Sequence, residues 1–168
     1  MSDAVLSTNV IEGTNYLAGV NQVIPESNWL NVGTFYDYYI TLDGRWLSVS
    51  SLEPKFLASL IKTLDLPENL LNTPLNNTES QNKFKKILQK KILERTREEW
   101  GAVFEGIDAC FELVLDLPKA IEHENFKKIR MVVKVPDQDG AYKKQIASPF
   151  KFSDCKTIYK HFGLGIGE

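Results

Sequence analysis

Two short runs rich in aromatic and β-branched residues flank an Asp-Gly pair in the first third of the chain. They cover residues 35–42 and 45–51, with Asp43 and Gly44 between them. The second run alternates apolar and polar positions, as a strand with one buried face does. Asp-Gly favours a two-residue type I′ turn, because both central positions of that turn need positive φ. The pattern therefore predicts a β-hairpin.

Apolar residues recur at helical spacing in several other segments. The first helix is expected over residues 3–23, and a second begins at Pro54, which suits the first position of a helix. Residues 68–78, rich in Asn, are expected to form a loop. A basic helix should follow over 79–93 with its apolar side chains facing inward: Phe84, Ile87, Leu88 and Ile92.

The second half of the chain continues the mixture of helices and strands. Thr96 and Glu99 fit a capping box, in which each side chain bonds the other residue's backbone N–H, and a short helix should follow. Cys110 lies in an apolar run and is expected to be a small core residue. Further elements are expected in order: a buried strand at 109–115, a short helix at 117–124, and a strand pair at 130–135 and 142–147. This order predicts an α+β fold.

The bulk composition limits the class of protein. The chain has 168 residues, is 43% hydrophobic and carries a net charge of −2. This balance gives no reason to expect nucleic acid or an anionic membrane as a partner. Cys110 and Cys155 form no zinc pattern and suit a reducing compartment. No signal-peptide pattern is present, and no apolar run approaches the ~18 residues of a membrane helix, so we expect a soluble, cytoplasmic protein.

Six stretches follow one another in the order of a known enzyme family: Val10–Leu17, Phe35–Phe56, Glu94–Trp100, Phe104–Cys110, Ala120–His123 and Pro149–Ser153. In the second stretch, Leu-Glu-Pro-Lys-Phe brings Glu53 to the start of a helix. The third and fourth contain Thr-x-x-Glu-Trp and Gly-x-Asp-Ala-Cys. Together they resemble the family III CoA-transferases (CaiB/BaiF-like), and most closely their α-methylacyl-CoA racemase branch.

The resemblance implies a fold and a division of the chain. Residues 1–24 would be the helix that leaves the family's large lobe, 25–153 the small α+β domain, and 154–168 a shortened C-terminal tail. The Rossmann-like large lobe, with its catalytic His and Asp, has no counterpart in the sequence, so we expect only the small-domain half of the enzyme. A further difference lies at 31–34, where relatives tend to show Gly-Gly-Ala-Pro.

The resemblance also implies three site residues. Glu53 matches a Glu that hydrogen-bonds the catalytic His, and a carboxylate at a helix N-terminus is stabilised by the helix dipole. Tyr36 matches a Tyr that lines the acyl pocket, and Leu52 matches an apolar wall of that pocket. From spacing alone, the simpler interpretations are a Glu that decorates a helix start and an ordinary strand aromatic. His123 and His161 pair with no evident nucleophile and are not expected to act in catalysis.

The implied reaction is removal and return of the α-proton of a 2-methylacyl-CoA thioester. No metal or redox cofactor is implied, because coenzyme A is part of the substrate and the thioester acidifies the α-carbon. By itself the chain is expected to be inactive. Two alternatives stay open: CoA transfer between carboxylic acids, and a non-catalytic remnant or interaction module. The expected partners are the acyl-CoA, once a large lobe completes the enzyme, and a second copy or a partner subunit.

Overall fold

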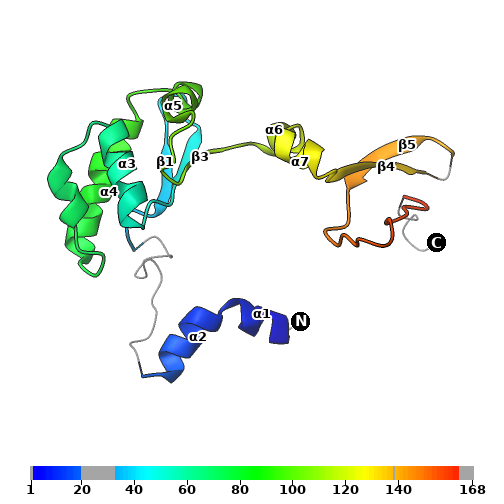
Figure 1. The fold of residues 1–168 in the computed structure, drawn as a ribbon, viewed down its shortest axis with the longest axis horizontal. Helices are drawn as coiled ribbons and strands as arrows, with labels where there is room; N and C mark the ends of the chain where they lie inside the picture. The colour runs from blue at the N-terminus through cyan, green and yellow to red at the C-terminus, as the bar shows by residue number, and fades with distance from the viewer. Residues whose placement is uncertain (1, 20–32, 138, 163–168) are drawn as a thin grey trace. The chain divides into compact units, whose positions relative to one another are not determined.

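The computed structural model describes residues 2–19, 33–137 and 139–162 (Figure 1). The chain divides into two compact units, Met1–Val114 and Leu115–Glu168, and each is described by itself. Both contain helices and antiparallel strands, which confirms the predicted α+β fold. The finer division at residues 24 and 153 stays a prediction.

The first unit contains a three-stranded antiparallel sheet in the order β1-β2-β3. The strands are β1 (Asp37–Ile40), β2 (Trp46–Val49) and β3 (Phe111–Val114). The hairpin predicted from the alternating pattern is β1–β2, and β3 pairs with β2 from far along the chain. One face of the sheet, with Tyr39, Leu47 and Val49, is buried.

The predicted two-residue turn is wrong, although the hairpin is confirmed. The last strand pair is Ile40 with Trp46. The Thr41 N–H then donates to the Arg45 carbonyl (2.9 Å), and the Gly44 N–H donates to the Thr41 carbonyl (3.0 Å). Gly44 has φ +70°, so the connection is a three-residue loop with a glycine in the left-handed region. A long-range contact accompanies this loop, because the Asp43 carboxylate accepts the Arg97 backbone N–H (3.1 Å).

Three α-helices and a 3-10 helix pack with this sheet. They are α3 (Pro54–Thr63), α4 (Thr78–Ile92) and α5 (Arg97–Phe104), together with the 3-10 helix η1 (Glu68–Asn72). Figure 1 shows α3 and α4 beside β1 and α5 above the strands. Pro54 opens α3, and the Thr96–Glu99 capping box opens α5, both as predicted. Residues 68–78 were expected to be a loop, so η1 corrects that expectation.

The inward face of α4 is narrower than its apolar pattern predicts. Phe84, Leu88 and Ile92 are fully buried, but Ile87 is 37% exposed. At about 100° of rotation per residue, Ile87 lies roughly 100° from the centre of the buried stripe. Glutamine 81, a polar residue, takes the buried place at the start of the stripe instead.

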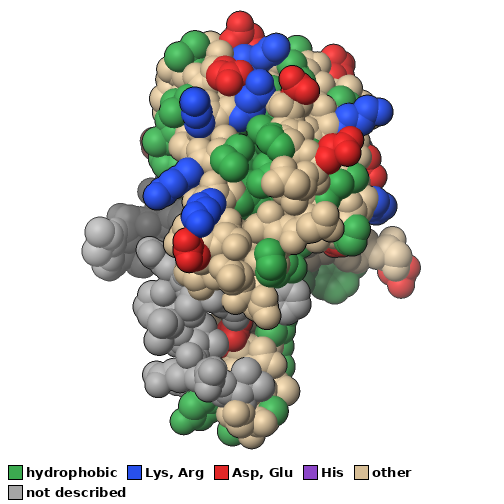
Figure 2. All heavy atoms as spheres, turned by 90° about the vertical axis from the view of Figure 1, so that its left-hand side faces the viewer, with side chains coloured by type: hydrophobic (Ala, Val, Ile, Leu, Met, Phe, Trp, Pro, Cys, Tyr) green, Lys and Arg blue, Asp and Glu red, His purple; other side chains and the backbone are tan. Residues whose placement is uncertain are grey.

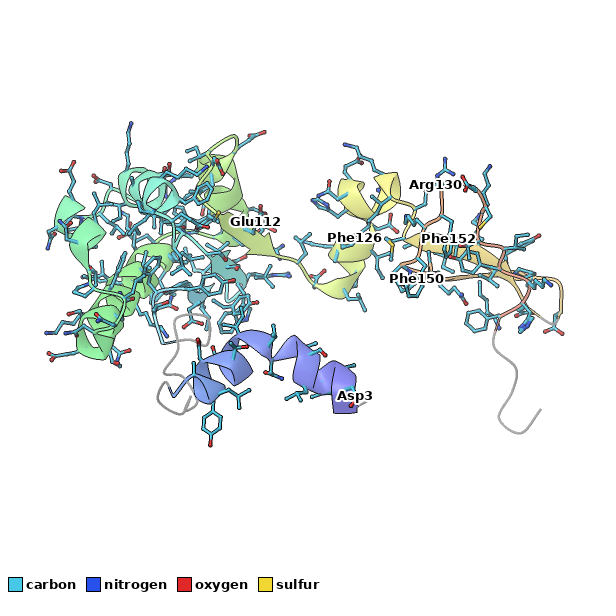
Figure 3. The ribbon with its side chains drawn as sticks, turned by 60° about the horizontal axis from the view of Figure 1, so that its bottom comes forward. Asp3, Glu112, Phe126, Arg130, Phe150 and Phe152 are labelled. Carbon is cyan, nitrogen blue, oxygen red and sulfur yellow. The ribbon has the colours of Figure 1, made fainter. Side chains whose placement is uncertain are left out.

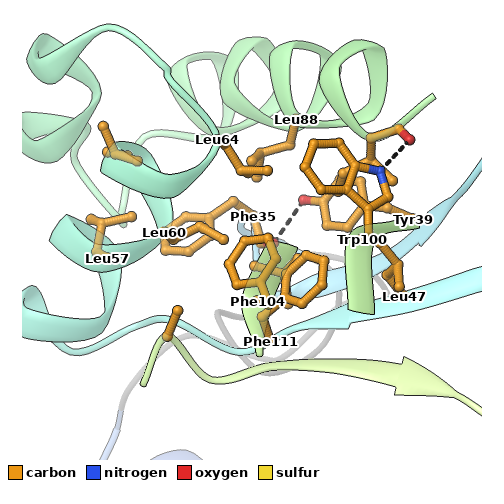
Figure 4. Packing of buried hydrophobic residues seen from close by; sticks show 14 of the residues in the cluster. Phe35, Tyr39, Leu47, Leu57, Leu60, Leu64, Leu88, Trp100, Phe104 and Phe111 are labelled. Carbon is orange, nitrogen blue, oxygen red and sulfur yellow. Dashed lines mark hydrogen bonds between the residues drawn. The ribbon is translucent and has the colours of Figure 1, made fainter. Parts of the chain in front are cut away.

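Aromatic side chains fill the core between the sheet and the helices (Figure 4). The rings of Phe104 and Phe111 stack with centroids 3.7 Å apart. The buried polar atoms of the large aromatics are bonded to main-chain carbonyls: Trp100 Nε1 donates to Ile92 (2.8 Å) and the Tyr39 hydroxyl donates to Phe35 (2.7 Å). Burial raises the pKa of the Tyr39 phenol above its usual range, and the nearby Asp37 carboxylate raises it further.

Three polar side chains of α4, spaced four residues apart, contact edge strand β1 or Phe35 just before it: Gln81, Lys85 and Gln89. Gln89 bonds both the N–H (3.1 Å) and the carbonyl (2.8 Å) of Ile40. Lys85 forms an ion pair with Asp37 (2.6 Å). Gln89 therefore satisfies backbone groups of β1 that an uncovered edge strand would expose.

The N-terminal helix expected at 3–23 is two helices in the described residues, α1 (Ser2–Thr8) and α2 (Val10–Leu17). They meet at Asn9, whose side chain and that of Thr8 both bond the Val5 carbonyl, so local side-chain bonds compete with the helix here. Residues 20–23, and nearly all of the connection predicted at 25–33, lie outside the described residues. The apolar side chains of α1 and α2 are exposed.

The second unit begins with two short helices, α6 (Leu117–Ile121) and α7 (Glu124–Lys128), where one was expected. His123 divides them, because its Nδ1 accepts the Asn125 N–H (3.3 Å) and caps α7. The predicted strand pair is confirmed as β4 (Val132–Pro136) and β5 (Tyr142–Ile146). The side chains of Phe126, Phe150 and Phe152, labelled in Figure 3, are exposed in this unit.

Candidate functional site

The structure forms a pocket of about 430 Å³ in the first unit, at the segment that the sequence singles out. One side comes from the end of the β2–α3 connection and the first turns of α3, and the other from η1 and the residues after it. The lining residues are Phe35, Leu52, Pro54, Leu57, Ala58, Leu71, Asn72, Thr73 and Leu75. On the face that carries α3, η1 and α4, hydrophobic side chains gather in the middle and charged ones lie toward the edges (Figure 2).

Two serines at the end of β2 determine where the β2–α3 connection lies. The buried Ser51 hydroxyl donates to the Ala109 carbonyl (2.5 Å), and the Ser50 N–H donates to the Cys110 carbonyl (2.9 Å). The Leu52 N–H folds back onto the Ser50 carbonyl (2.9 Å). These bonds anchor the connection beside the start of β3, so that Leu52 contributes to the pocket while packing against the core.

Glu53 is the N-cap residue of α3, as predicted, with extended backbone (φ −73°, ψ 140°). Its side chain is exposed and does not hydrogen-bond to the N–H groups of its own helix. The residues on both sides of it, Leu52 and Pro54, line the pocket. Its carboxylate is thus available to accept a hydrogen bond from an outside donor such as an imidazole N–H.

The charge of Glu53 acts on the thiol of Cys110. Partial burial raises the pKa of its thiol, and the carboxylates of Glu53 and Asp108 raise it further. The residue is half-buried, with φ +46°, so the expectation of a small core cysteine is wrong. The sequence alone did not predict that Cys110 lies near Glu53. The Gly-x-Asp-Ala-Cys motif marks Cys110, but only the pairing of β2 with β3 brings the two residues together.

Tyr36 is half-buried and immediately precedes β1. Its neighbour Phe35 is 1% exposed and lines the pocket, whereas Tyr36 is not among the lining residues. The structure therefore places Leu52 in the pocket, Glu53 at its border and Tyr36 beside a lining residue; the acyl-binding roles of Tyr36 and Leu52 stay predictions.

The far wall of the pocket is the part that sequence reasoning missed. Leu71, Asn72, Thr73 and Leu75 come from the segment that was expected to be a plain loop. Three leucines at positions 70, 71 and 75 interrupt this Asn-rich stretch, and they are the sequence signal that could have marked the wall.

A second hollow of about 480 Å³ lies between α5 and β3. The stacked rings of Phe104 and Phe111 form part of its lining, together with the acidic Asp108 and Glu112. Two carboxylates make it unfavourable for phosphate groups. The histidines lie in the second unit, at the cap of α7 and in the segment after β5.

Other classes of site were sought in the part of the chain that the structure describes. No three side chains of His, Cys, Asp or Glu converge there in a way that could hold a metal ion. None of the described helices combines the length and the apolar character needed to cross a bilayer.

Comparison with proteins of known sequence finds several relatives. The chain is 30% identical to human α-methylacyl-CoA racemase over 145 residues, which cover 80% of this chain and 38% of the human protein. It is 32% identical to the mouse α-methylacyl-CoA racemase over 134 residues, 72% of this chain and 34% of that protein. A CaiB/baiF CoA-transferase family protein of Caenorhabditis elegans is 32% identical over 49% of this chain.

Among solved structures, Rv3272 from Mycobacterium tuberculosis is similar in fold. A mutant form gives a TM-score of 0.69 at 12% identity and covers 95% of this chain but 41% of its own. An orthorhombic form of the same protein gives 0.68 at 13% identity. The matched region therefore covers 34–38% of the two racemases and 41–42% of Rv3272.

The sequence pattern of one family, CoA-transferase family III, matches residues 1–161. The resemblance found in the ordered motifs is thereby confirmed over nearly the whole chain. The protein belongs to CoA-transferase family III.

Proposed function

We propose that this chain supplies the small-domain side of an acyl-CoA enzyme similar to α-methylacyl-CoA racemase. One observation carries the proposal: Glu53 stands at the N-terminus of α3, with its carboxylate not used by its own helix, and its two neighbours line an apolar pocket. The two relatives that cover most of this chain are both α-methylacyl-CoA racemases. A carboxylate that can orient a catalytic imidazole, beside an apolar pocket, suits removal of a proton from the carbon next to a thioester.

In the proposed reaction, a base removes the α-proton of a 2-methylacyl-CoA, and an acid returns a proton to the opposite face of the enolate. The thioester acidifies the α-carbon, so the step needs no metal or redox cofactor. The proton carriers would be a His and an Asp in the family's large lobe, which this chain does not match. Glu53 would accept a hydrogen bond from that His and favour its charged form, while Leu52 and Tyr36 shape the acyl site.

We further propose that the 168-residue chain alone does not catalyse this exchange. A general base must lie within hydrogen-bond reach of the proton that it removes. In the first unit, no His is present in the sequence between residues 1 and 114. The chain spans 38% of the human relative, so the proton carriers are expected from the rest of the family's length.

The test is deuterium incorporation at the α-carbon of a 2-methylacyl-CoA in heavy water, followed by NMR. The chain is assayed alone and together with a second polypeptide that contains the part of the family enzyme that this chain does not match. We expect exchange only in the mixture, and a loss of about tenfold or more in the Glu53→Gln mixture, since one unit of pKa corresponds to about a factor of ten in the charged form. Glu68→Gln is the matched control, because Glu68 is also an exposed acid at a helix start.

CoA transfer between two carboxylic acids is the second candidate, favoured by the family as a whole and by the C. elegans relative. The same mixture distinguishes it when a free acid is added. CoA appearing on the added acid without exchange of the α-proton would replace the racemase proposal with the transferase one. A mixture that catalyses neither reaction would support a non-catalytic binding module, for which the exposed apolar side chains of α1 and α2 offer a surface to a second copy or a partner subunit.

A further inference from the structure

We propose that Asp139–Gly140, in the loop between β4 and β5, is a site of spontaneous isomerisation to isoaspartate, and that the fold protects Asp43–Gly44, in the loop between β1 and β2, from the same reaction. These are the two Asp-Gly pairs of the sequence, which contains no Asn-Gly pair. Glycine makes both pairs chemically competent, because no side chain shields the backbone nitrogen that attacks the aspartate. The difference between the two pairs comes from the structure.

The reaction proceeds through a cyclic succinimide. The Gly140 nitrogen attacks Cγ of the protonated Asp139 carboxyl group and forms an N–Cγ bond, while one carboxyl oxygen leaves as water with the amide hydrogen and the acid hydrogen. A water molecule then opens the ring. When it breaks the bond between the nitrogen and the main-chain carbonyl carbon of Asp139, the chain runs through the side chain, which is isoaspartate. No oxidant, metal or enzyme takes part.

The β4–β5 loop repeats the backbone bonds of the β1–β2 loop. The Asp137 N–H donates to the Ala141 carbonyl (2.7 Å), and the Gly140 N–H donates to the Asp137 carbonyl (3.1 Å). In the β1–β2 loop, the Gly44 N–H donates to the Thr41 carbonyl in the same way (3.0 Å). Both glycines lie in the left-handed region, with φ +70° for Gly44 and +78° for Gly140. The two attacking nitrogens are therefore held alike, and the aspartate carboxyl groups determine which pair reacts.

The Asp43 carboxylate is held by two donors. It accepts the Thr41 hydroxyl (2.5 Å) and the Arg97 backbone N–H (3.1 Å), the second of which lies at the start of α5. Attack by the Gly44 nitrogen requires the carboxyl group to leave both donors. The bond from Thr41, together with that from Arg97, also lowers the pKa of Asp43 and with it the fraction in the protonated form that reacts. Two bonds to a charged acceptor should slow the attack by about tenfold or more.

The Asp139 carboxylate accepts no hydrogen bond from any residue that the structure describes. Asp139 is exposed, and it bonds through its backbone, since its N–H donates to the Asp137 carboxylate (2.7 Å). The Asp137 carboxylate also forms an ion pair with Lys143 (2.6 Å). The charged contacts of this loop therefore hold the side chain of Asp137, whereas the side chain of Asp139 can turn toward the Gly140 nitrogen.

The product changes the loop that it forms in. Isoaspartate adds one carbon to the main chain between Asp139 and Gly140, so the bonds that Asp137 makes across the loop lose their geometry. The pairing of β4 with β5 should weaken first at the end next to the loop, where Pro136 pairs with Tyr142. The hairpin of the second unit would therefore age while the hairpin of the first unit does not.

The test ages the full chain for weeks at mildly acidic pH and then maps its peptides by liquid chromatography and mass spectrometry. Isoaspartate peptides separate from aspartate peptides of the same mass, and the succinimide is lighter by one water. In folded protein we expect isoaspartate to form about tenfold or more faster at residue 139 than at residue 43 of the same sample. In guanidinium chloride the bonds to Asp43 are lost, so the two rates should become similar.

Two variants test the two halves of the proposal. Asp139→Glu should remove the product at residue 139, because a glutamate would have to close a larger ring. Thr41→Val keeps the shape of the side chain but removes its hydroxyl, so it should speed isomerisation at residue 43 severalfold and leave residue 139 unchanged. Equal rates at the two pairs in the folded parent protein, or a difference that persists in guanidinium chloride, would overturn the proposal. These two measurements need no variant, so they decide the question even if Thr41→Val fails to fold.

Discussion

Gln81 should contribute more to stability than any other polar side chain on α4. It is fully buried, and its amide joins the Phe35 N–H to the Pro74 carbonyl. Gln81→Leu keeps a side chain of similar size but removes both bonds. Phe35 is 1% exposed, so its N–H would have no water to replace the lost partner. The substitution therefore tests a buried, unsatisfied donor and not a cavity.

The magnitude follows from the two lost bonds. Leaving the buried Phe35 N–H unsatisfied costs about 1–3 kcal/mol, and the bond to the Pro74 carbonyl, which is nearer to solvent, is worth about 1 kcal/mol. Gln81→Leu should therefore lower the free energy of unfolding by about 2–4 kcal/mol. Gln89→Leu is the matched control, because Gln89 makes the same two kinds of bond to Ile40 at a solvent-accessible position. Water can replace those bonds, so its loss should stay below about 1 kcal/mol.

Urea unfolding followed by tryptophan fluorescence measures both variants, since the Trp100 ring is buried in the same core. The comparison is between the losses in the free energy of unfolding of the two variants. Equal losses in Gln81→Leu and Gln89→Leu, or a loss below about 1 kcal/mol in the former, would show that burial does not make the Gln81 bonds more important than those of Gln89.

Three further predictions concern caps and charges. Thr96→Ala should lower the free energy of unfolding by about 1 kcal/mol in the same urea assay, because it removes the N-cap of α5. The hydrogen bond from Thr41 lowers the pKa of Asp43 below its usual 3.8, so Asp43 stabilises the fold above that pH and the stability difference from Asp43→Asn should shrink as the pH falls through the lowered value. Glu53→Gln should lower the pKa of Cys110 and speed its alkylation by iodoacetamide at fixed pH, read by peptide mass spectrometry; an unchanged rate would contradict their proximity.

Local patterns predicted those parts of the fold that depend on neighbours in the sequence. The hairpin, the helix opened by Pro54 and the capping box at Thr96 each need only a few adjacent residues, and all three are confirmed. The turn of the hairpin was mispredicted. Its Asp43 bonds a backbone N–H that lies 54 residues away, and no local pattern contains that partner.

The candidate site divides in the same way. Glu53 was found from its motif and from the helix start that follows it, and the structure places it there. The far wall of the pocket could not be found, because it depends on Gln81 of α4 bonding the Pro74 carbonyl seven residues earlier in the chain. Polar residues at 72 and 73 hid a short 3-10 helix, since the pattern of apolar residues in this segment is too brief to show a period.

Ser51 explains why the charge and the pocket occur together. Its buried hydroxyl bonds the Ala109 carbonyl at the start of β3, and this anchor determines where the next residues go. Leu52 then contributes to the pocket and packs against the core, while Glu53 reaches solvent at the first turn of α3. The bond made by Ser51 thus positions both Leu52 in the pocket and Glu53 at the helix start. A substitution at Ser51 would disturb both, whereas Glu53→Gln changes only the charge at the start of α3.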